Sequence, residues 1–204
     1  MPNYHGYSDR VAHALAFAAK HGAPLARPGM AGTYVTHPAN IAIILARYGC
    51  DETCLVAGVL GYLVNEAEPG RQADLRQRVG EKFGPKVAEV VDQVFEPRYD
   101  TRGKQRGWKA WKMDFLANLA LAEPRALEVC SATQIHLCGS MLTDLRRLGV
   151  EYLSQFAPAS AEEILWWYGE LAAALERHPV GPRPGMLDEL RLLSRRLAAD
   201  LATN

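Results

Sequence analysis

Four cysteines are the first side chains whose chemistry we consider, because paired thiols bind metals or form disulfides. Cys50 and Cys54 are four residues apart, whereas Cys130 and Cys138 lie farther along the chain. A zinc site would need Cys or His pairs at tighter ligand spacing, and the chain contains no Cys-x-x-Cys. We therefore expect buried, reduced thiols, with neither a zinc site nor disulfides.

Three other side chains could move protons. His37 lies in "THPANIA", and its imidazole titrates near neutral pH, which suits a general acid or base. Tyr62 and Glu66 belong to "LVAGVLGYLVNEAE", where apolar residues recur at helical spacing. Gly61 is unusual there, because a glycine inside a helix costs about 1 kcal/mol relative to alanine. Either a close packing partner or a lost side chain should explain this glycine.

The elements that must position these side chains are all predicted to be helices. Breaks between helical segments are explicit: Asp51 can cap the helix that carries Tyr62, Gly84 and Gly149 can end helices, and Ser160 with Glu163 forms a capping box. No segment alternates with period two for long enough to predict a strand. The fold class is therefore all-α, a single domain of about eight to nine helices.

The composition is that of a globular protein without a dominant charge. Of the 204 residues, 49% are hydrophobic and 23% charged, and 23 basic side chains balance 23 acidic ones. Such a chain has no long-range field to attract nucleic acid or an anionic membrane. The first residues do not resemble a signal peptide, and no run of eighteen apolar residues occurs. We expect a cytoplasmic protein that binds neither nucleic acid nor membrane.

We expect one helical domain with a C-terminal appendage. The domain is predicted to span residues 1–180, and residues 181–204 are predicted to carry an amphipathic helix with a stripe of leucines. This helix is expected to pack on its own domain. A contact in a homodimer is the alternative.

An ordered series of segments brings a family into view. The series starts at Tyr7 with "YSDRVAHALAFAAKHGAPLARPGMAGTYVTHPANIAIILARYGCDETCLVAGVLGYLVNEAE", and then come "EKFGPKVAEVVDQV", "WKAWKMDFL", "SATQIHLCGSMLTDLRRLG" and "EEILWWYGELAAAL". Together, over roughly residues 7–177, they resemble the HD-domain hydrolases of the RelA/SpoT type, which degrade guanosine tetraphosphate and pentaphosphate. The resemblance implies an HD-like helical domain.

The resemblance also implies a metal site. The family holds a divalent metal, usually manganese, with one His, a consecutive His-Asp pair and a later Asp, and the metal activates water. The corresponding positions here are His37, Gly61, Tyr62 and Thr133. Glycine offers no ligand, and neutral hydroxyls replace a carboxylate poorly on a hard cation. We therefore expect no metal, no cofactor and no metal-dependent hydrolysis.

Residues at and around these positions are predicted to line a remodelled cavity. Asn65 and Glu66 stand where the family has an acidic pair, and Trp111 stands where it tends to carry Arg. The candidate ligand-binding residues are Arg27, His37, Gly61, Tyr62, Asn65, Glu66, Trp111, Thr133 and Gln134. Tyr62 either fills the space left by the metal or lines a new pocket.

Two functions remain open from the sequence. The first is a pseudohydrolase, a metal-free HD-domain protein whose former active-site cavity binds an unknown small molecule or protein. The second is a metal-independent enzyme that uses His37, Tyr62 and Glu66 for acid-base chemistry on a less charged substrate. Fold alone cannot separate them, because function depends on the site. A surviving alarmone hydrolase is disfavoured by the missing ligands.

Overall fold

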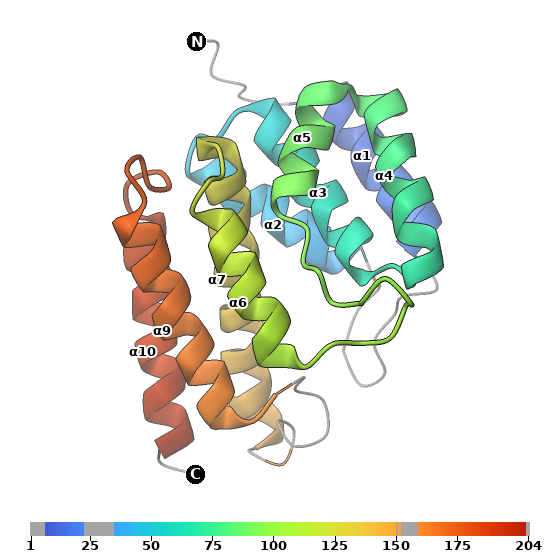
Figure 1. Cartoon of the computed structure of the whole chain (residues 1–204). Helices are drawn as coiled ribbons and strands as arrows, with labels where there is room; N and C mark the ends of the chain where they lie inside the picture. The colour runs from blue at the N-terminus through green and yellow to red at the C-terminus, as the bar shows by residue number, and fades with distance from the viewer. Residues whose placement is uncertain (1–6, 23–34, 150, 152–158, 203–204) are drawn as a thin grey trace.

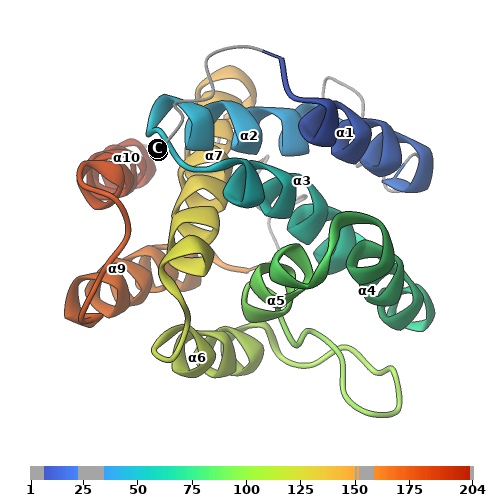
Figure 2. The ribbon, with the colours of Figure 1, turned by 90° about the horizontal axis from the view of Figure 1, so that it is seen from above.

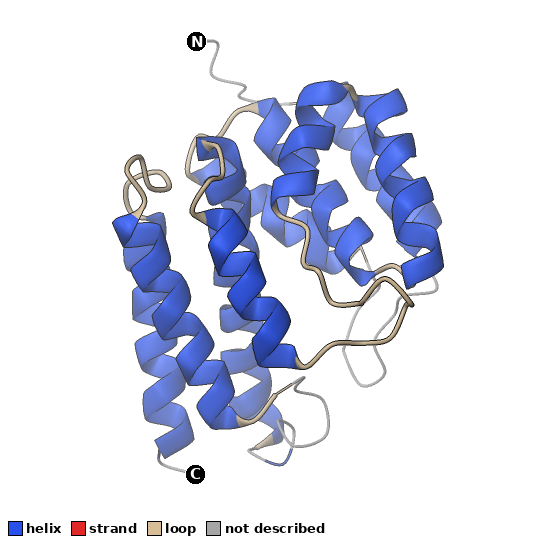
Figure 3. Ribbon diagram, in the orientation of Figure 1, coloured by secondary structure: helices blue, strands red, loops and turns tan. Residues whose placement is uncertain are grey.

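The computed structural model describes residues 7–22, 35–149, 151 and 159–202, and this part of the chain forms nine helices (Figure 1). The helices are α1 (Asp9–Gly22), α2 (Thr36–Arg47), α3 (Glu52–Glu66), α4 (Pro69–Phe83), α5 (Pro85–Gln93), α6 (Trp108–Leu119), α7 (Pro124–Leu148), α9 (Ala161–Arg177) and α10 (Met186–Ala202). Over these residues the only extended pairing is an isolated bridge between Tyr99 and Gln105 (Figure 3). The predicted all-α fold class is confirmed.

The ends of the helices follow the local signals in the sequence. The Asp51 carboxylate accepts a hydrogen bond from the Cys54 backbone N–H at the start of α3. Ser160 and Glu163 form the predicted capping box of α9. Gly84 and Gly149 follow α4 and α7 with positive φ angles of 94° and 79°, which favour glycine.

Helix α3 lies at the centre of the molecule, with α1, α2, α5 and α7 around it (Figure 2). Every residue from Val56 to Val64 is buried. Gly58 allows the close approach of α2, because a Cβ there would lie 2.6 Å from Leu45 Cδ1 and 3.0 Å from Ile41 Cγ2. The core is thus built around the helix that carries Gly61 and Tyr62.

Helix α10 packs along α7 and α9 at one edge of the molecule (Figure 1). Its buried face consists of Met186, Leu190 and Leu197. At its start the Tyr48 hydroxyl donates a hydrogen bond to the Glu189 carboxylate. Within the described ranges, no helix has the length and apolar character needed to cross a membrane.

Candidate functional site

Three rings from three helices meet beside the core. His37, in the first turn of α2, stacks on Tyr62 of α3 with ring centroids 5.1 Å apart and planes 9° apart. The ring of His136, from α7, meets His37 edge-on at 4.5 Å. His37 and Tyr62 are 8% and 7% exposed, so the stack has little contact with water. We call these three residues the His37 cluster.

The glycine before Tyr62 has a close packing partner. A Cβ at position 61 would lie 3.1 Å from Val94 Cγ2, which is tighter than ordinary van der Waals contact. Val94 directly follows α5, so Gly61 lets the end of α5 pack onto α3. Any larger side chain at this position would have to displace Val94.

The space beside Tyr62 is a cavity of about 20 Å³. Its walls are Gly61, Tyr62, Asn65, Val94, Glu96, Phe115, Val129, Cys130, Thr133 and Gln134. Five of the predicted ligand-binding residues are therefore brought together here. A cavity of this size holds about one water, whereas ligand sites usually measure 300 Å³ or more.

Three of these residues use their polar atoms within the fold. The Thr133 hydroxyl donates to the Val129 carbonyl one turn earlier, at 2.8 Å. The Gln134 side-chain oxygen accepts from the Trp167 indole N–H at 3.0 Å. Asn65 donates to the Val94 carbonyl at 2.9 Å and accepts from the Glu96 N–H at 2.8 Å. These contacts fasten α7 to α9 and the end of α5 to α3.

Glu66 belongs to a chain of ion pairs. Its carboxylate lies 2.9 Å from Arg98 Nη1, and Arg98 Nη2 lies 2.6 Å from the Glu96 carboxylate. The second oxygen of Glu96 accepts from Lys112 Nζ at 2.8 Å. The carboxylates of Glu66 and of the lining residue Glu96 are thus paired with cations of the protein itself.

Lys112 is buried among tryptophan rings. Its ammonium lies 3.8 Å from the ring centroid of Trp167, 4.5 Å from that of Trp111 and 5.6 Å from that of Trp108. Trp111, a predicted ligand-binding residue, is 4% exposed and also packs under the Arg98 guanidinium. It is not among the walls of the cavity, so its visible role is to enclose the two cations.

The buried pair of Glu96 and Lys112 was not predicted from the sequence. Burial alone would raise the pKa of Glu96, but the charges of Lys112 and Arg98 together outweigh burial and lower this pKa to about 2. Burial lowers the pKa of Lys112, and the charge of Glu96 opposes this shift. The available signal in the sequence was that Lys112 directly follows Trp111 and lies one helical turn after Trp108. Its acidic partner, Glu96, lies in the loop that precedes this helix.

The surroundings of His136 in the His37 cluster favour its neutral imidazole. Burial, reinforced by the neighbouring charge of His37, lowers the pKa of His136 to about 4. His136 is therefore uncharged at neutral pH. Its Nε2 atom is buried, and no hydrogen-bond partner for it occurs among the described residues.

The described residues around His37 include few of the groups that bind metal ions. Over the described ranges, no group of three or more His, Cys, Asp or Glu side chains is arranged to hold a metal ion. The cluster offers two imidazoles, a phenol and no carboxylate. The carboxylate of Glu66 is paired with Arg98. Arg27, the remaining predicted ligand-binding residue, lies outside the described residues.

A family model and two solved structures show what this chain is similar to. The family model described as "HD domain" matches residues 14–161, so the chain belongs to the HD-domain family. Within it, the chain has a SpoT-like fold. It superposes on a metazoan orthologue of SpoT that hydrolyses ppGpp, with a TM-score of 0.70 and 20% identity, covering 94% of this chain and 97% of the orthologue.

A second solved structure has the same fold. It is a protein of Listeria monocytogenes EGD-e, with a TM-score of 0.63 and 22% identity, covering 78% of this chain and 96% of that one. No curated protein matches the chain. The resemblance inferred from the sequence is confirmed for family and fold, and identities at this level carry no conclusion about activity.

Proposed function

We propose that this chain is a metal-independent pseudohydrolase, an HD-domain protein of the cytoplasm that acts by binding a small molecule or protein rather than by hydrolysing an alarmone. The family position of the His-Asp pair, by the resemblance, is occupied by Gly61 and Tyr62. A protein of this kind keeps the helical scaffold and uses its former site for packing. Its effect in the cell would depend on whether the small molecule or protein is bound.

The stacking of Tyr62 on His37 is the observation that carries this proposal. The tyrosine ring covers the imidazole of His37, which by the resemblance is the one metal ligand of the family that this chain keeps. Beside the ring remains a cavity of about 20 Å³, which is too small for a nucleotide or a hydrated metal. A binding role at this place would therefore need Tyr62 to move, and a binding surface elsewhere needs no such movement.

The donor set supports the same proposal. A hard divalent cation prefers carboxylate oxygens, and the carboxylates of Glu66 and Glu96 are held in ion pairs. Releasing Glu96 would leave the buried Lys112 without its partner, at a cost of several kcal/mol.

The alternative is a metal-independent enzyme with His37, Tyr62 and Glu66 as acid-base groups. Its support is the neutral, half-buried imidazole of His136 beside His37, which could accept a proton. Glu66 forms an ion pair with Arg98 and is not one of the three residues of the His37 cluster. A substrate would also need far more room than the cavity offers. Exchange of Tyr62→Phe tests this alternative, since an acid-base hydroxyl would be lost while the ring remains.

The proposal is tested by metal analysis and by a hydrolysis assay. Purified protein is dialysed against manganese, its metal content is measured, and ppGpp turnover is followed with manganese present. A SpoT-type hydrolase with the complete ligand set serves as the positive control. We expect no stoichiometric manganese and no turnover above that of the buffer. One manganese per chain that is lost in His37→Ala, or turnover that requires manganese, would contradict the proposal.

A further inference from the structure

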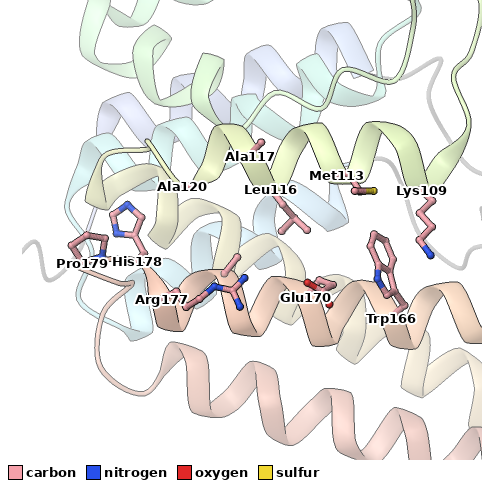
Figure 4. A pocket seen from close by; sticks show the side chains of 11 residues that line it. Lys109, Met113, Leu116, Ala117, Ala120, Trp166, Glu170, Arg177, His178 and Pro179 are labelled. Carbon is pink, nitrogen blue, oxygen red and sulfur yellow. The ribbon is translucent and has the colours of Figure 1, made fainter.

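A groove of about 540 Å³ lies between α6 and α9 (Figure 4). The two helices run side by side in the same direction (Figure 1). None of the residues that line this groove lines the Tyr62 cavity. The volume is within the range of small-molecule sites, about 300 to 1,000 Å³. We call it the α6–α9 groove.

The α6 side of the groove is apolar between its two ends, whereas Glu170 lies between these ends on the α9 side (Figure 4). Met113, Leu116 and Ala117 line the groove from α6, and Ala174 lines it from α9. Met113 is 57% exposed. Ala117 on α6 and Ala174 on α9 leave room for an unbranched apolar chain that forms no hydrogen bonds.

The ends of the groove carry cations. Arg177 and His178 lie where α9 ends, and Lys109 with Trp166 lies at the opposite end (Figure 4). In the part of the chain that the structure describes, neither Arg177 nor Lys109 forms an ion pair with an acid; the Lys109 ammonium rests 4.7 Å over the Trp166 ring. Glu170 is the one acid in the lining, so the groove carries more positive than negative charge.

His178 can add a second hydrogen-bond donor next to Arg177. Its Nδ1 atom accepts from the backbone N–H groups of Val180 and Gly181, both at 3.3 Å. The neutral ring therefore carries its proton on Nε2 and donates from there. A guanidinium and an imidazole N–H at one end of an apolar groove suit an acidic group.

We infer that the α6–α9 groove binds a small amphipathic anion, with a carboxylate at Arg177 and His178 and an unbranched apolar chain lying along Leu116, Ala117 and Ala174. The surplus of positive charge selects the anion over a cation or a neutral molecule of the same length. The proposed loss of hydrolysis does not enter this inference, because the groove is lined by other residues.

Decanoate, used below its micellar concentration, is the probe. Isothermal titration calorimetry compares its binding to the full chain with that of decanol and decylammonium. We expect saturable binding of one decanoate per chain and at least tenfold weaker binding of the other two. No saturable decanoate binding up to millimolar concentration, or equal binding of all three, would overturn the inference.

Matched variants locate the site. Ala117→Arg fills the groove and should abolish binding, whereas Asn118→Arg adds the same charge at the next exposed residue, outside the lining, and should leave binding unchanged. Arg177→Gln should weaken binding about tenfold, and Arg196→Gln on α10 should not. Circular dichroism checks that each variant is folded, and Ala120→Arg is the second groove-filling variant.

Experiments with the same variants distinguish other occupants of the α6–α9 groove. Binding that survives both groove-filling variants would place decanoate elsewhere and refute the assignment. Sedimentation of the ligand-free chain tests for a second copy on this face, and a dimer that Ala117→Arg dissociates would replace the small ligand by a self-contact. An acidic amphipathic peptide that binds through Ala117 while decanoate does not would assign the groove to a protein partner.

Discussion

Gly61 has no side chain, and Val94 packs closely against it. Because a Cβ there would lie 3.1 Å from Val94 Cγ2, we expect Gly61→Leu to lower the free energy of unfolding by about 1 to 3 kcal/mol through overpacking. Gly139→Leu is the control, since a Cβ at this helical glycine meets no described atom within 4 Å. It should be neutral or stabilise by up to about 1 kcal/mol. Urea unfolding of both variants measures the difference.

The buried Glu96 should make stability depend on pH in the acid range. Its pKa is about 2 in the folded protein against 4.5 as the ordinary value, because the charges of Lys112 and Arg98 outweigh burial. A lowered folded pKa gives stability that is fully present above about pH 4.5 and is lost as the pH falls towards 2. The difference corresponds to about 3 kcal/mol.

Urea unfolding at several pH values between 6 and 2 tests this contribution. Glu96→Gln should lower stability at pH 6 by about 3 kcal/mol, because Lys112 stays buried without its partner, and should flatten the acid dependence. Glu89→Gln makes the same chemical change on the exposed side of α5 and should keep the dependence of the wild type. Parallel pH profiles for wild type and Glu96→Gln would show that the pair does not act as described.

The sequence predicted individual residues of the site better than their partners. Gly61 was recognisable as anomalous from its place in a helix, yet Val94 could not be identified as its neighbour, because 33 positions along the chain separate them. The Glu96–Lys112 pair was missed for a similar reason: each residue looks solvated in its own segment, and burial arises only when α6 packs against α9 and the preceding loop.

Among the elements, α10 offers the clearest test of whether a terminal helix belongs to the core. Leu190 is fully buried against the domain, whereas Leu192, two residues later, is 43% exposed. Leu190→Ala should therefore reduce the free energy of unfolding by about 2 to 5 kcal/mol, and Leu192→Ala by about 0.5 kcal/mol or less. Equal, small effects in chemical unfolding would mean that α10 contributes little to the stability of the domain.

The helices themselves were predictable because their signals are local. Caps such as Asp51 and Ser160 act within four residues, and glycines with positive φ end α4 and α7. The position of α10 instead depends on contacts such as that of Tyr48, which directly follows α2, with Glu189, 141 residues apart. For this reason the sequence predicted that α10 packs on its own domain but left a homodimer contact as the alternative. An apolar stripe does not identify the surface that covers it.

In the whole molecule, one continuous cluster of buried residues joins the helices from α1 to α10. This predicts a single cooperative unfolding transition, because no group of helices has a core of its own. The tryptophans lie only in α6 and α9, whereas far-UV circular dichroism reports on every helix. Urea curves from tryptophan emission and from circular dichroism should therefore share one midpoint. If emission changes first, α6 and α9 separate before the α1–α5 half unfolds, and the shared core does not enforce cooperativity.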